Sequence, residues 1–235
     1  MPILTFNAAD HRYELDGFHA WSVTQLFHLV GLTRWDEVQP SRLETARIRG
    51  SVVHQASHYY NENDFDVQDF EAECIATGHP EYIGFLRSWI RLRDTGRIEP
   101  VLCEHRVANV GPRYAGTFDL LCRFDGQAAL LDYATGDPID ACKHLQTAAY
   151  VLAAKAWAQM NPDETVLRKF LDQFPTVQRY AVRLHPEGEL PTLTHYTDSR
   201  DFSRFIMIAT AVNLVEDERR SAIPWKWDDE PVGVR

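Results

Sequence analysis

The spacing of apolar residues predicts an ordered series of elements along the chain. These are two short strands over 3–7 and 11–17, helices over 25–30, 43–60 and 80–90, three strands between 99 and 136, a helix over 139–160, two strands over 177–186 and 189–198, and a closing helix over 199–220. The polar, acidic stretch 61–73 has neither period, so we expect a loop or an irregular excursion there. The tail 223–235 also has no clear period and is expected to be a docked strand or a loose end.

This order of elements is typical of an α/β domain in which helices pack on a mixed sheet. Hydrophobic residues make up 45% of the 235 positions, enough for one sizeable core, and no repeat, low-complexity tract or linker divides the chain. We therefore expect a single domain, with an N-terminal hairpin and helix over 1–40, a core over 41–160, and C-terminal strands and a helix over 161–235.

A predicted hairpin turn fixes where two carboxylates lie. Asp125 and Gly126 suit the central positions of a type I′ turn, and pairing outward from that turn places Asp119 opposite Asp132. Cβ atoms at opposed positions are about 4.5–5.5 Å apart, and two like charges there destabilise a sheet unless a cation lies between them. An aspartate at a strand end often only caps a turn or a following helix, but two in register fit that alternative badly. The pair therefore predicts a divalent metal site.

The remaining positions of the hairpin indicate the interior of a sheet. One face is expected to carry Phe118, Leu120, Cys122, Ala129, Leu131 and Tyr133, while the aspartates share the other face with Leu121 and Leu130. A third carboxylate joins the pair if the preceding strand turns tightly at Gly111-Pro112, because Glu104 then lies beside Asp119. Proline fits the second central turn position poorly, so a longer loop is the alternative.

Polar side chains on two predicted helices are candidates for contact with a polyanion. One helix presents Lys143, Gln146 and Tyr150 on a face apart from its apolar stripe of Leu145, Ala149, Leu152 and Ala156. Arginines cluster around two other helices: Arg42, Arg47 and Arg49 in the first, and Arg87, Arg91, Arg93 and Arg97 in the second. Ordinary solvated surface is the alternative for each set, and the net charge of −10 argues mildly against a polyanionic partner.

The cysteines and the hydropathy of the chain indicate its compartment. Four cysteines are widely spaced with no CxxC, which predicts reduced core thiols and neither a zinc ribbon nor a disulfide framework. No apolar stretch approaches the roughly 20 residues of a membrane helix, and the N-terminus lacks a signal-peptide pattern. We expect a cytoplasmic protein.

Four motifs taken in order carry a family resemblance. His54 in RGSVVH, Asp119 in GTFD, Asp132 in LDYATG, and Gln146 with Tyr150 in QTAAY strongly resemble the RecB-like branch of the PD-(D/E)XK nuclease superfamily. The opening HRYELDGFHAWSVTQLF resembles stand-alone phage and prophage members and the mitochondrial genome maintenance exonuclease. The resemblance implies a bacterial or phage-encoded protein with a restriction-endonuclease-like core, a central mixed sheet flanked by helices.

The resemblance also assigns roles to residues. It implies that Asp119 and Asp132 bind one or two Mg²⁺ or Mn²⁺ ions, with the imidazole of His54, the backbone carbonyl of Tyr133 and, on the turn argument above, Glu104 as further ligands. Carboxylates suit Mg²⁺ and imidazole suits Mn²⁺, and the metal would acidify a water for attack on a phosphodiester. The resemblance further implies that Gln146 and Tyr150 hold the DNA strand, and we expect Lys143 and Arg49 of the polar sets above to add DNA contacts. Relatives with an iron–sulfur cluster carry grouped cysteines after the core, and none follows Cys142, so no cluster is expected.

The chain departs from the family pattern at Ala134, where the family has a lysine. Residue 134 shares a face with Asp132, so a lysine there would reach the metal-bound water or the scissile phosphate, and alanine cannot. Three explanations are open: a naturally degenerate nuclease, a lysine replaced to trap uncut DNA, or relocation of the ammonium to Lys143. The intact remaining motifs favour the second.

The function expected from the sequence is therefore a metal-dependent DNA exonuclease of recombination, repair or phage DNA processing, acting on single strands or duplex ends and inactivated at Ala134. The alternative is a pseudonuclease that binds DNA or a protein partner.

Overall fold

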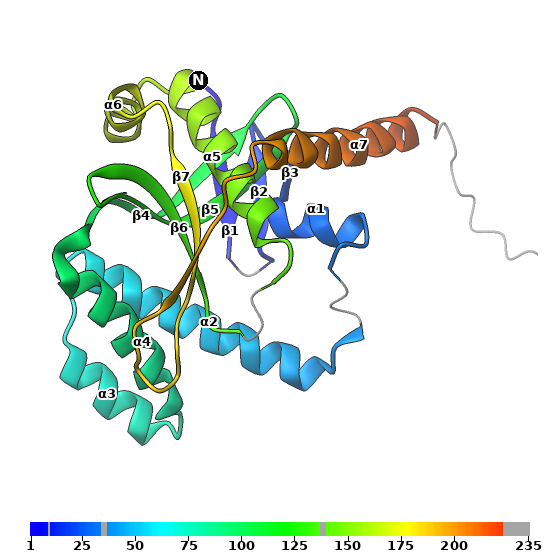
Figure 1. The fold of residues 1–235 in the computed structure, drawn as a ribbon. Coiled ribbons are helices and arrows are strands. Elements are labelled where there is room, and N and C mark those ends of the chain that lie inside the picture. The colour runs from blue at the N-terminus through cyan, green and yellow to red at the C-terminus, as the bar shows by residue number, and fades with distance from the viewer. Residues whose placement is uncertain (9, 34–36, 137–139, 223–235) are drawn as a thin grey trace, which may run out of the picture.

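The fold comes from a computed structural model that describes residues 1–235 except 9, 34–36, 137–139 and 223–235 (Figure 1). The strands are β1 (Leu4–Asn7), β2 (Arg12–Leu15), β3 (Phe18–Ser22), β4 (Ile98–Asn109), β5 (Tyr114–Phe124), β6 (Gln127–Ala134), β7 (Gln178–Arg183) and β8 (Thr192–His195). The α-helices are α1 (Val23–Leu29), α2 (Pro40–Asn61), α3 (Val67–Ala76), α4 (Glu81–Leu92), α5 (Lys143–Met160), α6 (Thr165–Gln173) and α7 (Arg200–Ala222). The predicted α/β fold with a mixed sheet is confirmed.

The strands form one sheet that branches at β5. Strand β4 pairs antiparallel along β5, and the opposite edge of β5 is shared by two strands. At the start of that edge, β3 pairs in parallel with Tyr114 and Ala115. From Leu120 onward, β6 pairs antiparallel with the same edge. Beyond β6 come β7 and β8, and β1 and β2 continue from β3. Residues 116–119 of β5 therefore lie where β3 and β6 diverge, and we call this place the fork.

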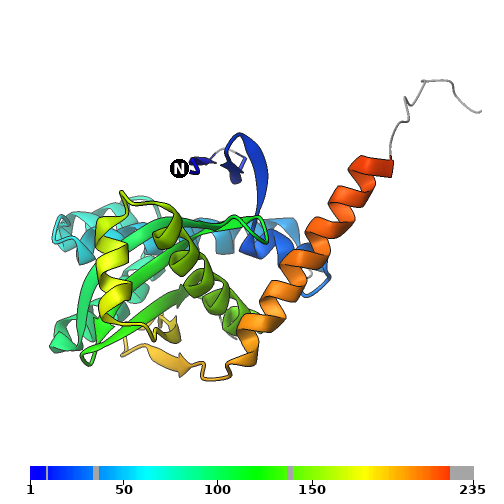
Figure 2. The ribbon, with the colours of Figure 1, turned by 90° about the horizontal axis from the view of Figure 1, so that it is seen from above.

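Helices cover both faces of the sheet. Helices α1, α5, α6 and α7 pack on one face over a core that includes Phe118, Trp157 and Phe205. Helices α2, α3 and α4 pack on the other face over Trp89 and Leu131 (Figure 1). Seen from above, α7 runs on past the sheet (Figure 2). The central strands are thus buried from two sides, which explains the nearly continuous apolar run of β6.

A capping box defines the start of the first helix. The Ser22 hydroxyl accepts a hydrogen bond from the Gln25 backbone N–H at 3.1 Å, and the Gln25 side chain accepts one from the Ser22 N–H at 2.9 Å. This reciprocal capping starts α1 directly after β3. The four cysteines are free thiols, and no helix among the described residues is long and apolar enough to cross a membrane.

The loop expected over 61–73 is wrong, because α3 begins within it. Asp66 caps this helix by accepting hydrogen bonds from the N–H groups of Gln68 and Asp69, and Phe70 and Cys74 pack inward four residues apart. Helix α6 was also missed, although Leu167 and Phe170 bury one side of it. The expected helix start at Ile139 and the tail 223–235 lie outside the described residues, and α5 begins at Lys143.

One side-chain assignment in the hairpin is also wrong. Phe118 was expected to share a face with Leu120, but it packs with Leu121 in the core under α5, while Leu120 packs on the α4 side. The pairing of β5 with β6 ends at Leu120, so the twist of β5 before that residue is no longer held by β6.

Helix α4 approaches the backbone of the segment after β7 too closely for a side chain. A Cβ added at Gly84 would overlap the carbonyl group of Pro186. We expect Gly84→Ala to lower the free energy of unfolding by at least about 2 kcal/mol, measured by urea denaturation, because the backbone must move apart. Gly50→Ala in α2 is the matched control, since its Cβ meets no atom within 4 Å. It should stabilise the chain by about 0.5–1 kcal/mol, and equal effects of the two changes would contradict this packing.

Candidate metal centre

The hairpin that positions the two aspartates has the predicted register. Phe124 pairs with Gln127, and the turn residues Asp125 and Gly126 have φ angles of 50° and 75°, as a type I′ turn requires. Continued along the strands, this register sets Asp119 level with Asp132.

At the fork a side chain replaces a backbone pairing. The ladder between β5 and β6 stops at Leu120 and Leu131, and the next free donor on β6, the N–H of Tyr133, bonds to Oδ2 of Asp119 at 2.5 Å. This bond holds one oxygen of the buried Asp119 carboxylate and leaves Oδ1 to face helix α2.

Glu104 lies opposite Asp119, although the β4–β5 loop has four residues, 110–113, rather than a tight turn. The flanking pairs, Cys103 with Leu120 and His105 with Phe118, set this register. Glu104 has a φ of 45°, a left-handed conformation that is uncommon outside glycine and that clusters at functional sites. Its Oε1 atom is buried and makes no hydrogen bond among the described residues.

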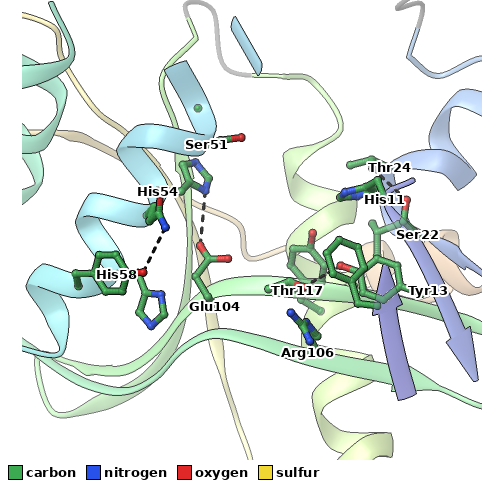
Figure 3. Close-up of a pocket in the computed structure, with 17 residues that line it drawn as sticks. His11, Tyr13, Ser22, Thr24, Ser51, His54, His58, Glu104, Arg106 and Thr117 are labelled. Carbon is green, nitrogen blue, oxygen red and sulfur yellow. Dashed lines mark hydrogen bonds and ion pairs between the residues drawn. The ribbon is translucent and has the colours of Figure 1, made fainter. Parts of the chain in front are cut away.

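His54 joins the two carboxylates from helix α2. Its Nδ1 atom lies 3.2 Å from Oδ1 of Asp119 and 3.9 Å from Oε1 of Glu104. One potential ligand atom from each of these three residues lies within 4.8 Å of the others. Figure 3 shows the imidazole pointing from α2 down toward Glu104. His58, one turn further along α2, pairs with Glu62 at 3.1 Å.

The electrostatics of the cluster are those of acidic groups crowded in a partly buried site. Burial, aided by the charge of Asp119, raises the pKa of Glu104 to about 8. Burial also raises the pKa of Asp132 to about 6, against the attraction of Lys143. Burial alone would lower the pKa of His54, but the Asp119 and Glu104 carboxylates outweigh it and raise that pKa. A crowded set of oxygens with one unpartnered atom fits a divalent metal bound by His54, Glu104 and Asp119.

Lys143 points into this cluster rather than out to solvent. Its ammonium group forms an ion pair with Asp132 and donates a hydrogen bond to the carbonyl oxygen of Tyr133 at 3.1 Å. The Lys143 side chain is only 13% exposed. The Tyr133 carbonyl therefore faces the centre, where the family pattern expects a ligand, and Asp132 is held by a cation from α5.

Gln146 and Tyr150 lie on α5, and Tyr150 lines the same pocket as His54 and Glu104. The Gln146 amide donates a hydrogen bond to the Tyr150 hydroxyl at 3.1 Å, and the Tyr150 side chain is buried. A Cβ added at Gly116 would lie 2.6 Å from the Tyr150 ring, which explains the glycine of the GTFD motif. Of the three polar residues expected on a face apart from the apolar stripe, Tyr150 packs against β5 and also lines the pocket that contains His54 and Glu104.

Arg49 and Ala134 are neighbours at the end of β6. The Nε atom of Arg49 donates to the Thr135 hydroxyl at 3.3 Å, and its guanidinium lies 5.4 Å from the centre of the Phe85 ring. Ala134 is buried and stands two residues after Asp132, as the family lysine would.

Three of the seven arginines in the two predicted clusters form ion pairs with acidic partners. Arg47 pairs with Glu44, and two arginines of the second cluster form two-bonded pairs with carboxylates, Arg87 with Glu71 and Arg97 with Asp125. These exposed pairs reduce the free positive charge at those three positions.

A sequence model of the PD-(D/E)XK nuclease superfamily matches residues 21–217. The chain belongs to this superfamily. Its members are nucleases that use divalent metal ions and act on DNA, so a nuclease with a metal site is the function that this membership supports. No curated protein matches the chain.

One supporting residue of the centre was missed from the sequence. Asn61 falls within the loop expected over 61–73, but it is the last residue of α2. Its side chain donates to the Tyr133 hydroxyl and accepts from the Trp89 indole, both at 3.1 Å. It thereby fixes Tyr133, whose N–H holds Asp119. An asparagine at a helix end carries no sequence signal for such a bridge.

The raised pKa of Glu104 predicts how stability changes with pH. Between about pH 4.5 and pH 8 the folded metal-free chain keeps a proton that the unfolded chain has released, so stability falls as pH rises through this window. The variant Glu104→Gln has no carboxyl at this position, so it should not show this fall in stability. In EDTA its melting temperature should therefore rise relative to that of the parent chain between about pH 5 and pH 8.

Thermal melts with Mn²⁺ added at the higher pH should reverse this order, because the variant lacks a ligand. Glu99→Gln, at the exposed start of the same strand, is the control and should track the parent chain. If the melting temperatures of Glu104→Gln and the parent chain changed in parallel with pH, the raised pKa of Glu104 would be contradicted.

Proposed function

We propose that the chain is a metal-dependent DNA exonuclease that hydrolyses phosphodiester bonds from strand ends in a recombination, repair or phage DNA-processing pathway. The observation that carries the proposal is the cluster of His54, Glu104 and the buried Asp119, in which a buried Glu104 oxygen makes no hydrogen bond among the described residues. Superfamily membership over residues 21–217 gives the reaction class. We also infer that the chain acts as one nuclease domain.

Three residues of the centre, His54, Glu104 and Asp119, would bind the metal. Asp119 is fixed by the N–H of Tyr133 in the sheet, and His54 approaches Asp119 from helix α2. The two candidate ligands are therefore held by different parts of the fold. Glu104 adds the oxygen without a partner. When bound, Mg²⁺ or Mn²⁺ would lower the pKa of a water and stabilise charge on the phosphate.

Lys143 is proposed to supply the ammonium that the family carries at position 134. The ion pair with Asp132 supports this role, because a lysine at 134 would bring its ammonium to the same carboxylate from the same strand. The Nζ atom can stabilise charge on the phosphate or give a proton to the leaving oxygen. The relocation explanation for Ala134 is thus the one that the geometry favours.

A second candidate function is a pseudonuclease that binds DNA without cutting it, or a protein-interaction module. Ala134 is the observation in its favour, since a methyl group can neither donate a proton nor stabilise charge. In that case Lys143 is only the counter-ion of Asp132.

Nuclease assays on four forms of the chain separate these functions. End-labelled single-stranded and duplex DNA, and circular DNA without ends, are incubated with Mg²⁺ or Mn²⁺. We expect the parent chain to degrade DNA with ends only, and Lys143→Met to reduce the rate by about 10²- to 10⁴-fold. Ala134→Lys in the Lys143→Met background should restore activity. Lys155→Met is the matched control, since Lys155 bonds to the Pro175 carbonyl elsewhere on α5.

Other outcomes have distinct meanings. Activity only after Ala134→Lys would show a disabled exonuclease and remove the role of Lys143. If no folded form degraded DNA, the pseudonuclease would be supported. Cleavage of circular DNA would contradict action at strand ends.

A further inference from the structure

The outer side of helix α7 is an exposed surface that plays no part in the metal centre. The inner side of this helix packs against α1 and α5, with Phe205 and Ala209 buried in the core. The outer side carries Met207, Leu214 and Val215, whose exposed fractions are 63%, 58% and 49%. Figure 2 shows α7 running on past the sheet. Large apolar side chains are therefore gathered on a helix that projects from the body of the domain, and such a patch marks an interaction surface.

The exposed residues of α7 recur at the spacing of a coiled coil. Steps of four, three, four, three and four residues connect six exposed positions: Arg200, Arg204, Met207, Ala211, Leu214 and Glu218. This spacing keeps all six on one side of the helix, as the a and d positions of a heptad lie along one seam. We call these six residues the α7 seam. A seam of this kind packs against a second helix that has the same period.

Charge is separated along the α7 seam. Its first two positions are arginines, its middle is apolar and its last position is a glutamate. Arg200 and Arg204 contact Asp198 at 2.9 and 3.2 Å, in exposed ion pairs of a kind that contributes little stability. Glu218 forms no ion pair within the part of the chain that the structure describes. The seam is therefore complementary in charge to a second copy of itself that runs in the opposite direction.

One antiparallel register satisfies the middle and both ends of the seam together. A two-fold axis midway between Met207 and Ala211 sets these two against each other, so that a large side chain faces a small one. The same axis sets Arg200 of one copy opposite Glu218 of the other. Parallel pairing would instead place Arg204 against Arg204 and Glu218 against Glu218, and like charges that face each other disfavour a complex.

The same register gives the second arginine an apolar contact. It sets Arg204 opposite Leu214 of the other copy, so the arginine stem covers the leucine while the guanidinium stays in water. A two-fold axis makes every one of these contacts twice, and the interface closes with two copies.

We propose that α7 joins two copies of this chain in an antiparallel homodimer through the α7 seam. The seam spans about 27 Å at 1.5 Å per residue, so the interface is small and we expect a dissociation constant of about 1–100 µM. The inference goes beyond the proposed nuclease function and does not depend on it, because the seam shares no residue with the metal centre.

Sedimentation equilibrium of the full chain between about 1 and 200 µM tests the dimer. We expect the average mass to rise with concentration from that of one chain toward that of two. Met207→Asp should raise the dissociation constant at least about tenfold, because it buries an unpaired charge at two symmetric places. Val166→Asp is the matched control, since Val166 is 53% exposed on α6, and it should associate like the parent chain.

Exchanging the charges of the seam tests its direction. Arg200→Glu places two carboxylates opposite each other at both ends, and at low salt it should raise the dissociation constant by about 3- to 10-fold. Adding Glu218→Arg to this variant should return the constant to within about twofold of the parent value, because the opposed charges attract again. Circular dichroism confirms the fold of each variant.

The mass of one chain at every concentration would overturn the inference and assign the seam to a different partner. A dimer that Met207→Asp leaves intact would also overturn it, because the interface would lie elsewhere. A dimer whose affinity the Arg200→Glu change leaves unaltered would contradict the antiparallel direction. Sedimentation needs neither metal nor DNA, so a monomer that cuts DNA would contradict only the seam, and a dimer without nuclease activity would contradict only the proposed function.

Discussion

The hydrogen bond from the Tyr133 N–H to Asp119 is the interaction on which the centre depends. It stands at the fork, where β6 leaves β5 and its next backbone donor has no ladder partner. A buried N–H without an acceptor costs about 1–3 kcal/mol, so the carboxylate at 119 supports the sheet as well as the metal site. Because Oδ2 of Asp119 is held by this bond, the other oxygen, Oδ1, faces His54. Asp119 therefore contributes both to the hydrogen bonding of the sheet and to the geometry of the ligands.

The centre also joins the two helix layers across the sheet. The imidazole of His54 arrives from α2 on one face, and the ammonium of Lys143 arrives from α5 on the other. Each contacts a different aspartate of the hairpin. Neither layer alone neutralises the acids, so the layered α/β architecture is a requirement of the site and not merely its support.

Much of this arrangement could be predicted from the sequence because its signals are local. The Asp125-Gly126 turn fixed the hairpin register, and that register brought the aspartates level. Glu104 was expected beside Asp119 through a tight turn at Gly111-Pro112, and the pairing of β4 with β5 puts it there across a longer loop. Residues whose contacts are distant in sequence were harder. The inward direction of Lys143, the bridge made by Asn61 and the packing of Phe118 all depend on how helices dock and where β6 diverges. The helices α3 and α6 were missed or misassigned because they are short and half polar.

The Lys143–Asp132 ion pair has a consequence for the order in which the molecule assembles. Strands β4, β5 and β6 follow one another in the chain, so they can pair early through nearby contacts. At that stage three carboxylates would gather on bare strands with only water around them. When α5 packs over Asp132, it would leave the buried carboxylate without a counter-ion if the helix did not begin with Lys143. The chain thus brings its own counter-ion as the second layer closes, and assembly can proceed from sheet to helix before any metal arrives.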